Sequence, residues 1–239
     1  MNQLLDKTLS QIVTENYQAA IVFEKYGLDY CCRGKRRLDE ACHEKQIDEA
    51  TVITELNALM GRRPIGTDLN ALSLTELAEN ITRVHHSYIR QTCPQIYAYL
   101  TRVALKHGDR FPYMKEVHRL FGDVQRELSE HMLKEEKILF PRIKQLELFE
   151  KPHNSMDFLQ APIDVMEEEH ENEGEKMASI RSLTNNYQPA EDACTTHRIV
   201  LASLKAFEED LHQHVHLENN ILFPKALASF RRMHTEPIY

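Results

Sequence analysis

An eleven-residue motif occurs twice in this sequence, and it constrains the fold more than any other feature. The copies are HMLKEEKILFP at residues 131–141 and HVHLENNILFP at residues 214–224. Both copies keep a histidine, a glutamate four residues later and then Ile-Leu-Phe-Pro, whereas the intervening residues change freely. Because residues four apart lie on the same face of a helix, each copy predicts a helix that presents a histidine and a carboxylate side by side.

The apolar spacing predicts an all-α protein in two parts. Four long segments with helical periodicity indicate a four-helix bundle. They cover about residues 73–106, with Pro94 kinking or resetting the helix, and about residues 112–140, 162–185 and 191–223. Shorter helices at about residues 8–26, 38–45 and 48–60 form a small helical module before the bundle. The stretch from 61 to 72 carries Gly and Pro with little periodicity. We therefore predict domains at residues 1–60 and 73–239, joined by a linker.

Each predicted bundle helix places one histidine on its apolar stripe. On the first helix, Leu77 and Ile81 lead to His85 at helical spacing. His86 is one position off this stripe, so we expect it to face outward and to be dispensable for metal binding. In the third helix, Gly174 leaves space beside the cluster. The same test on the other three helices completes a set of six inward donors: His85, His131, Glu135, His170, His214 and Glu218.

Taken singly, an inward histidine or a His/Glu pair is usually structural. Six such donors in one apolar core are different, because each lost hydrogen bond costs about 1–3 kcal/mol and each unpaired charge costs more. Bound metal removes this cost, and six ligands are too many for one zinc site of about four. We expect two metal ions, with about eight protein donor atoms against about twelve for two octahedral ions. An oxo or hydroxo bridge would leave roughly one open position per metal, and the ligand types exclude neither manganese nor zinc.

Two adjacent cysteines, Cys31 and Cys32, form a second candidate site. Adjacent cysteines do not readily close a disulfide, and the basic residues at 33 and 35–37 would favour thiolates. We predict a reactive or metal-handling dithiol, with two incidental loop thiols as the alternative. The other cysteines lie within or next to helical patterns, and we expect them to be buried: Cys42, Cys93 and Cys194.

Composition excludes several classes of function. The formal net charge of -8 opposes binding to a nucleic-acid backbone. The start of the chain, MNQLLDKTLS, lacks a charged leader followed by an apolar core, and the longest apolar runs are too short for a membrane span. We therefore expect a cytoplasmic protein without membrane or nucleic-acid partners.

The motifs resemble those of a known family. HMLKEEKILFP and HVHLENNILFP, preceded by RVHH and MEEEHENEG respectively, resemble the hemerythrin-like di-iron domain of the bacterial iron-sulfur cluster repair proteins, the repair of iron centres family. YGLDYCCRGKRRL, at residues 26–38, resembles the di-cysteine module that precedes that domain. The resemblance covers nearly the whole chain. It implies that the six donors bind two iron ions, that Cys31 and Cys32 are the paired thiols, and that the protein is a homodimer. It also implies the repair of iron-sulfur clusters damaged by oxidative or nitrosative stress, with iron supplied to the damaged clients.

Two other functions fit the same residues. A di-iron enzyme could reduce nitric oxide or peroxide with electrons that enter through Cys31 and Cys32. A reversible dioxygen carrier or sensor is the third candidate. It is disfavoured by the thiol module, which carriage does not need, and by four histidines where carriers usually have a fifth.

Overall fold

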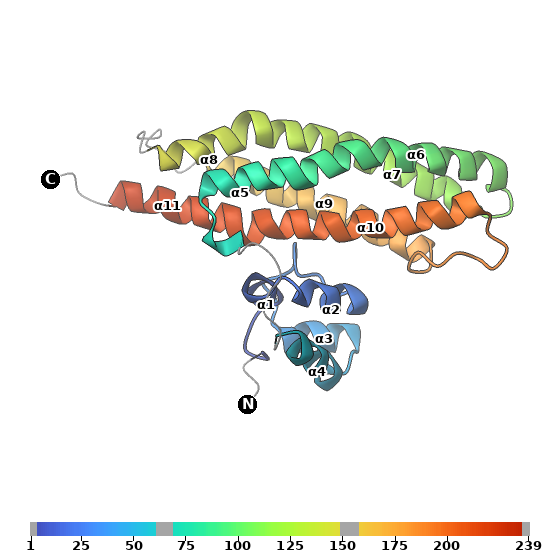
Figure 1. Ribbon diagram of the computed structural model, residues 1–239, viewed down its shortest axis with the longest axis horizontal. Coiled ribbons are helices and arrows are strands. Elements are labelled where there is room, and N and C mark those ends of the chain that lie inside the picture. The colour runs from blue at the N-terminus through green and yellow to red at the C-terminus, as the bar shows by residue number, and fades with distance from the viewer. Residues whose placement is uncertain (1–3, 61–68, 149–157, 236–239) are drawn as a thin grey trace.

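The computed structural model describes residues 4–60, 69–148 and 158–235, and it confirms the predicted all-α fold. Within these ranges the chain forms helices and turns without a strand, apart from one isolated bridge between Thr8 and Arg37. Four long rods lie side by side in a bundle, and a small helical module lies against one side of it (Figure 1). None of the described helices is both long and apolar enough to span a bilayer.

The four rods are built from ten helical segments of the described chain, and three rods contain a wide π turn. The first rod is α5 (Leu74–Ile81), η2 (Thr82–His86) and α6 (Ser87–His107). The second is α7 (Tyr113–Lys134), η3 (Glu135–Leu139) and α8 (Phe140–Glu147). The third is α9 (Gln160–Leu183) alone, and the fourth is α10 (Thr195–Leu217), η5 (Glu218–Leu222) and α11 (Phe223–Thr235). The helix α6 continues through Pro94, so the predicted reset at this residue is wrong.

The π turns explain the repeated motif. In each copy the π turn begins at the glutamate and a proline follows it, Pro141 in one copy and Pro224 in the other. Proline cannot donate the regular helical hydrogen bond and its ring crowds the carbonyl four residues earlier, which favours an irregular turn at this point. A π turn also shifts the residues after it by about one position on the helix face. Ile138, which regular helical spacing after His131 and Glu135 would place on the core face, is accordingly 45% exposed, whereas Leu139 is buried.

The apolar core is divided into two clusters by a polar layer. One cluster joins the module to the part of the bundle that contains Leu100, Phe121 and Phe207. The other packs α5 and α8 against α11, with Phe140 and Phe223 at its centre. Along each rod, the predicted polar ligands lie where residues of one cluster give way to residues of the other. The bundle therefore holds the predicted ligands in a single layer between the two clusters.

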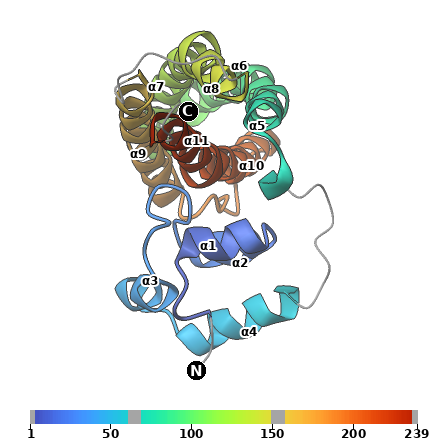
Figure 2. The same cartoon turned by 90° about the vertical axis from the view of Figure 1, so that its left-hand side faces the viewer.

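The module consists of α1 (Leu9–Glu15), α2 (Ala19–Tyr26), α3 (Leu38–Lys45) and α4 (Glu49–Met60). Figure 2 shows α1 and α2 next to the bundle and α4 farther away. The single helix predicted at residues 8–26 is wrong, because α1 ends at Asn16, whose backbone is extended and whose side-chain oxygen accepts a hydrogen bond from the Gln18 N–H. The predicted end of this segment at residue 26 is confirmed, since Gly27 follows α2 as its C-cap with a φ of 62°.

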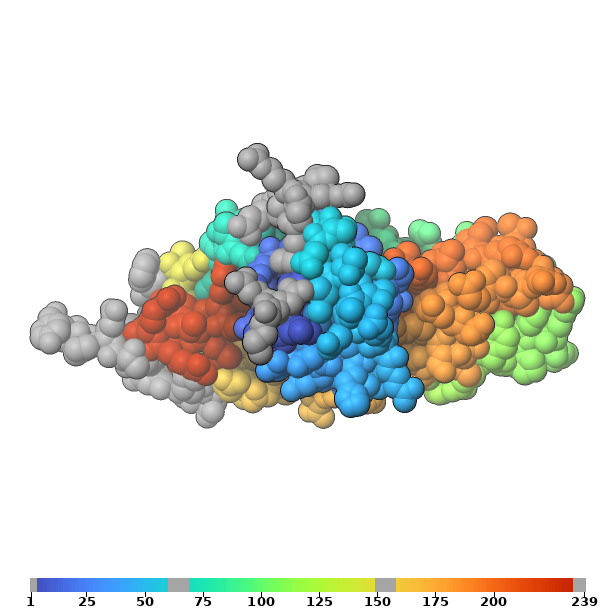
Figure 3. Space-filling view, turned by 90° about the horizontal axis from the view of Figure 1, so that it is seen from below, coloured from blue at the N-terminus to red at the C-terminus, as the bar shows by residue number. Residues whose placement is uncertain are grey.

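The module covers the middle of the bundle (Figure 3). The His212 ring donates a hydrogen bond to Glu24 over 2.6 Å, and the side-chain amide of Asn220 donates to the Cys31 carbonyl over 3.1 Å. Most of the predicted linker, residues 61–68, lies outside the described residues, and η1 (Leu69–Ala71) occupies its last part. The polar loop before α9, residues 149–157, and the tail at 236–239 also lie outside them.

We predict that Glu147 stabilises the end of the bundle where α5 begins. Its carboxylate accepts hydrogen bonds from the backbone N–H groups of Leu74 (2.6 Å) and Thr75 (3.1 Å), so α8 caps the first turn of α5. Glu147→Ala should lower the free energy of unfolding by about 1 kcal/mol, as loss of a helix cap does, in chemical denaturation. The matched control Glu130→Ala, an exposed glutamate on α7, should change it by less than about 0.5 kcal/mol. Equal effects of the two substitutions would show that the cap does not contribute.

Candidate metal centre

Four histidines and two glutamates from the four rods meet in the polar layer of the bundle. They form two overlapping groups, and within each group the possible ligand atoms all lie within 4.8 Å of one another. The first group is His86, Glu135, His214 and Glu218, and the second is His131, Glu135, His170 and Glu218. Both glutamates therefore belong to both groups.

The carboxylates lie between the two histidine pairs. Glu218 Oε1 is 2.9 Å from His214 Nε2, and Glu218 Oε2 is 3.1 Å from His170 Nε2. Glu135 Oε2 is 3.3 Å from His86 Nε2 and 3.4 Å from His131 Nε2. Each glutamate thus faces one histidine of each pair, which is the arrangement needed for a carboxylate that bridges two metal ions.

The donor set is buried and its charge is not satisfied by protein hydrogen bonds. Glu135 and Glu218 are both 0% exposed. Among the described residues, neither oxygen of Glu135 nor Oε2 of Glu218 has a hydrogen-bond partner. An unpaired buried carboxylate costs several kcal/mol. Two cations held by nitrogen and oxygen donors would remove this cost, so the residues present fit a two-metal centre.

The pKa shifts of the buried side chains also indicate a cation-binding site. Burial by itself lowers the pKa of His131, but the charges of Glu135, Glu169 and Glu218 raise it to about 10. Burial by itself raises the pKa of Glu218, but His214 and His170 hold it well below its usual value. Positive charge is therefore favoured beside the carboxylates at His131, whereas burial lowers the pKa of His214. Bound metal ions would take over this charge and displace protons from the rings.

Three ligand histidines are oriented by a second hydrogen bond. The Nδ1–H groups of His86, His131 and His170 donate to three acceptors, which are Glu136 (2.7 Å), Glu169 (2.9 Å) and Asn219 (2.9 Å) respectively. Such bonds fix the tautomer and leave Nε2 free for a metal. We did not predict these acceptors from the sequence. Each is a direct neighbour in sequence of a ligand on another rod, and this adjacency was the available signal.

The structure brings together five of the six predicted donors and places His86, rather than His85, with them. The prediction that His86 faces outward is wrong, because its side chain is 0% exposed. The cause is η2, since a turn of five residues after Ile81 ends on His86, whereas regular helical spacing pointed to His85. His85 instead donates from Nδ1 to Asp210 over 3.0 Å. Its ring stacks on His214, with centroids 5.6 Å apart and planes at 3°.

Cys31 and Cys32 lie where the module meets α9. Both are free thiols, and Cys32 Sγ is 3.6 Å from the carbonyl oxygen of His170. A hydrogen bond to Cys32 and burial raise the pKa of Cys31 well above its usual value, which opposes the effect of the basic residues on this thiol. Gly174 lies beside Cys32 rather than beside the cluster, since a Cβ there would contact Cys32 Sγ at 3.8 Å, an ordinary van der Waals distance. The predicted burial of the other cysteines is confirmed for two, and Cys194 is half-buried.

A four-helix bundle whose core holds two His/Glu groups with shared carboxylates defines the hemerythrin-like class of cation-binding proteins. Comparison with known protein families agrees with this class. Residues 77–226 match the family described as Hemerythrin HHE cation binding domain, and residues 5–60 match a Domain of Unknown function (DUF542). The chain is 35% identical over 223 residues to the "Iron-sulfur cluster repair protein YtfE" of Enterobacter sp. (strain 638), of Citrobacter koseri and of Escherichia coli O8 (strain IAI1). Each match covers 93% of this chain and 97% of the relative. The chain therefore belongs to the family of iron-sulfur cluster repair proteins with a hemerythrin domain, as the motifs predicted.

We predict that His86 and His85 differ in their effect on metal content. His86→Ala removes a donor from the first group and should lower the metal content of the purified protein by about one ion per chain. His85→Ala removes a neighbour and should leave the content unchanged. Elemental analysis of protein prepared without exposure to air measures both values, with helix content from circular dichroism as the folding control. Loss of metal from His85→Ala alone would contradict the assignment.

Proposed function

We propose that this protein repairs damaged iron-sulfur clusters by supplying iron from a centre of two iron ions. The observation that carries the proposal is the sharing of both buried glutamates by two histidine pairs. The names of the relatives, which are iron-sulfur cluster repair proteins, support iron as the metal and damaged iron-sulfur proteins as the clients. The proposed ligands are His86, His131, Glu135, His170, His214 and Glu218.

The donor atoms of the proposed centre would bind Fe²⁺ weakly enough for the ion to be exchanged. The centre offers imidazole nitrogens and carboxylate oxygens, and Fe²⁺ is near the weak end of the affinity order of divalent first-row metals for such donors. No thiolate belongs to either group, so the centre lacks the ligands that hold iron most firmly in clusters. When bound, two iron ions with an oxo or hydroxo bridge would supply open positions for a small ligand such as nitric oxide or dioxygen.

The surrounding residues hold the donors in place for this task. Glu136, Glu169 and Asn219 fix three histidine rings, and the two apolar clusters exclude water from both ends of the layer. Cys31 and Cys32 lie against the helix that carries His170, and we propose that they handle the iron on its way to a client. The same proposal takes a cytoplasmic homodimer as the working form, as the family resemblance implies.

The transfer of labelled iron from this protein to a damaged client enzyme tests the proposal. The full chain is loaded with isotopically labelled iron and mixed with an iron-sulfur enzyme whose cluster has been damaged by nitric oxide. We expect the enzyme to regain activity and to acquire the label. Glu135→Ala, which removes a shared carboxylate, should abolish both effects, whereas Glu130→Ala on the exposed face of the same rod should retain them.

Two outcomes would contradict supply of iron. In the first, the client recovers equally well with the Glu135→Ala protein. In the second, the protein with a reductant consumes nitric oxide over many turnovers and protects the client while no label reaches it. The second result would favour the enzymatic function.

A further inference from the structure

We propose that Asp29, Cys31 and Cys32 form a third metal site that binds one thiophilic divalent ion. The site lies in the module, outside the two-metal centre. Its role as a station for iron in transit rests on the proposed function, whereas its ability to bind metal does not.

The loop that follows α2 gathers the three side chains. Their possible ligand atoms all lie within 4.8 Å of one another. Asp29 Oδ1 accepts hydrogen bonds from the backbone N–H groups of Cys31 (3.1 Å), Cys32 (3.0 Å) and Arg33 (3.3 Å), and from the Cys31 thiol (3.3 Å). The carboxylate thus shapes the loop so that both thiols lie beside it. These four bonds all go to Oδ1, so Oδ2 is the oxygen that can bind an ion.

The separation of the two sulfurs fits a metal better than a disulfide. Cys31 Sγ and Cys32 Sγ are 3.7 Å apart. Two thiolates on one tetrahedral ion, each at about 2.3 Å from the metal, lie about 3.8 Å from each other. A disulfide would require about 2.05 Å between the sulfurs and usually at least about 4.4 Å between the Cα atoms, whereas adjacent Cα atoms are only about 3.8 Å apart. The thiols are therefore already spaced for chelation.

A cavity of about 300 Å³ gives cations access to the dithiol. Cys31 and Cys32 form one part of its wall, and three carboxylates of α9, Glu167, Glu168 and Glu171, form another, with Lys35 as the opposing charge. Asn219, which accepts the hydrogen bond from His170 Nδ1, lines the same cavity. The cavity thus reaches from the thiols to a residue that touches a ligand of the two-metal centre.

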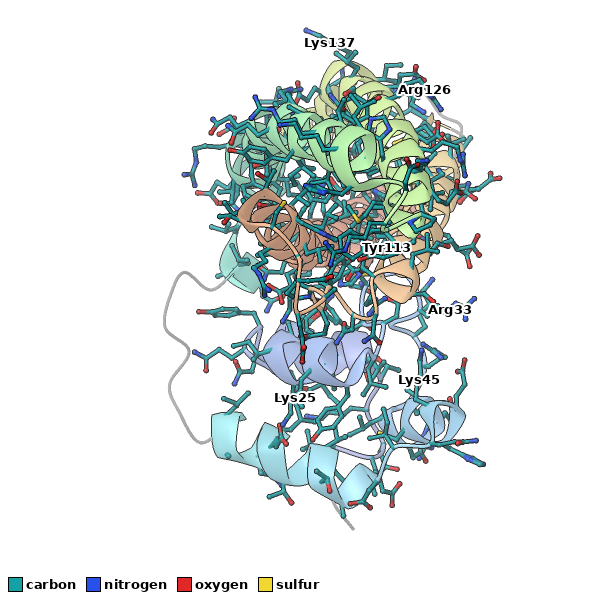
Figure 4. All side chains as sticks on the ribbon, turned by 90° about the vertical axis from the view of Figure 1, so that its right-hand side faces the viewer. Lys25, Arg33, Lys45, Tyr113, Arg126 and Lys137 are labelled. Atoms are coloured by element: carbon teal, nitrogen blue, oxygen red, sulfur yellow. The ribbon has the colours of Figure 1, made fainter. Side chains whose placement is uncertain are left out.

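The binding step is an exchange of protons for metal. One divalent ion binds to both sulfurs, the two thiol protons pass to water, and the metal keeps its oxidation state. Arg33 and Lys35 line the two cavities beside the thiols and offset the negative charge of the thiolates. Figure 4 shows Arg33 at the junction of the module and the bundle.

Cobalt(II) added to the full chain tests the site. Cobalt bound to thiolates has a sulfur-to-metal charge-transfer band in the near ultraviolet, whereas cobalt bound to histidine and carboxylate does not. We expect this band to saturate at one ion per chain. It should disappear in the double variant Cys31→Ser/Cys32→Ser, and Asp29→Asn should weaken the binding by about tenfold or more. Cys194→Ser, which changes a half-buried thiol outside the site, is the matched control and should leave the band intact.

Circular dichroism and the filling of the His/Glu centre show that each variant is folded. If the His/Glu centre fills with cobalt and no thiolate band appears, the third site is overturned. A band that persists in the double variant, or one that is lost in Cys194→Ser, also overturns it. If the band behaves as expected and labelled iron does not reach a client, the supply of iron fails while the third site stands.

Discussion

The structure depends on one constraint, which is that two carboxylates buried in an apolar core need positive charge beside them. Glu135 and Glu218 are inaccessible to solvent, and three of their four oxygens have no hydrogen-bond partner in the described chain. Four imidazoles converge on them from all four rods. The π turns bring the glutamates of two rods and the histidine of a third to the same level, and the apolar clusters on both sides keep water away. Bound metal ions would satisfy this constraint, and the four rods hold the donor side chains in place around them.

The small N-terminal module packs against the bundle beside the proposed metal centre. It shares an apolar cluster with the bundle, and its contacts with α10 and η5 use side chains that are close in sequence to the proposed ligands. His212 bonds to Glu24, and Asn220 bonds to the Cys31 carbonyl. The dithiol is consequently held beside His170 through its carbonyl oxygen. The proposed metal centre in the bundle and the thiol pair on its outer side are in contact through Cys32 and His170, and this contact supports the proposal that the protein passes metal to a partner.

Regular periodicity predicted the rods, the module and most of the metal centre. It succeeded where helices are uniform, as for His170 in α9, and where the repeated motif itself fixed the spacing, as for His131 and Glu135. It failed at η2, because a π turn changes the residue that faces the core and the sequence RVHH offers two adjacent histidines. The break at Asn16 was missed because a side-chain hydrogen bond outweighed the apolar spacing. The contacts between rods that fix the histidine rings depend on the tertiary packing, which helical spacing does not encode.

We propose that two metal ions lie between the histidine pairs and share both glutamates. Anomalous X-ray diffraction at the iron absorption edge, from crystals of protein purified with its native metal, tests this most directly. We expect two peaks per chain, one beside His86 and His214 and one beside His131 and His170, with a carboxylate oxygen of Glu218 next to each. A single peak, or peaks remote from these four histidines, would contradict it.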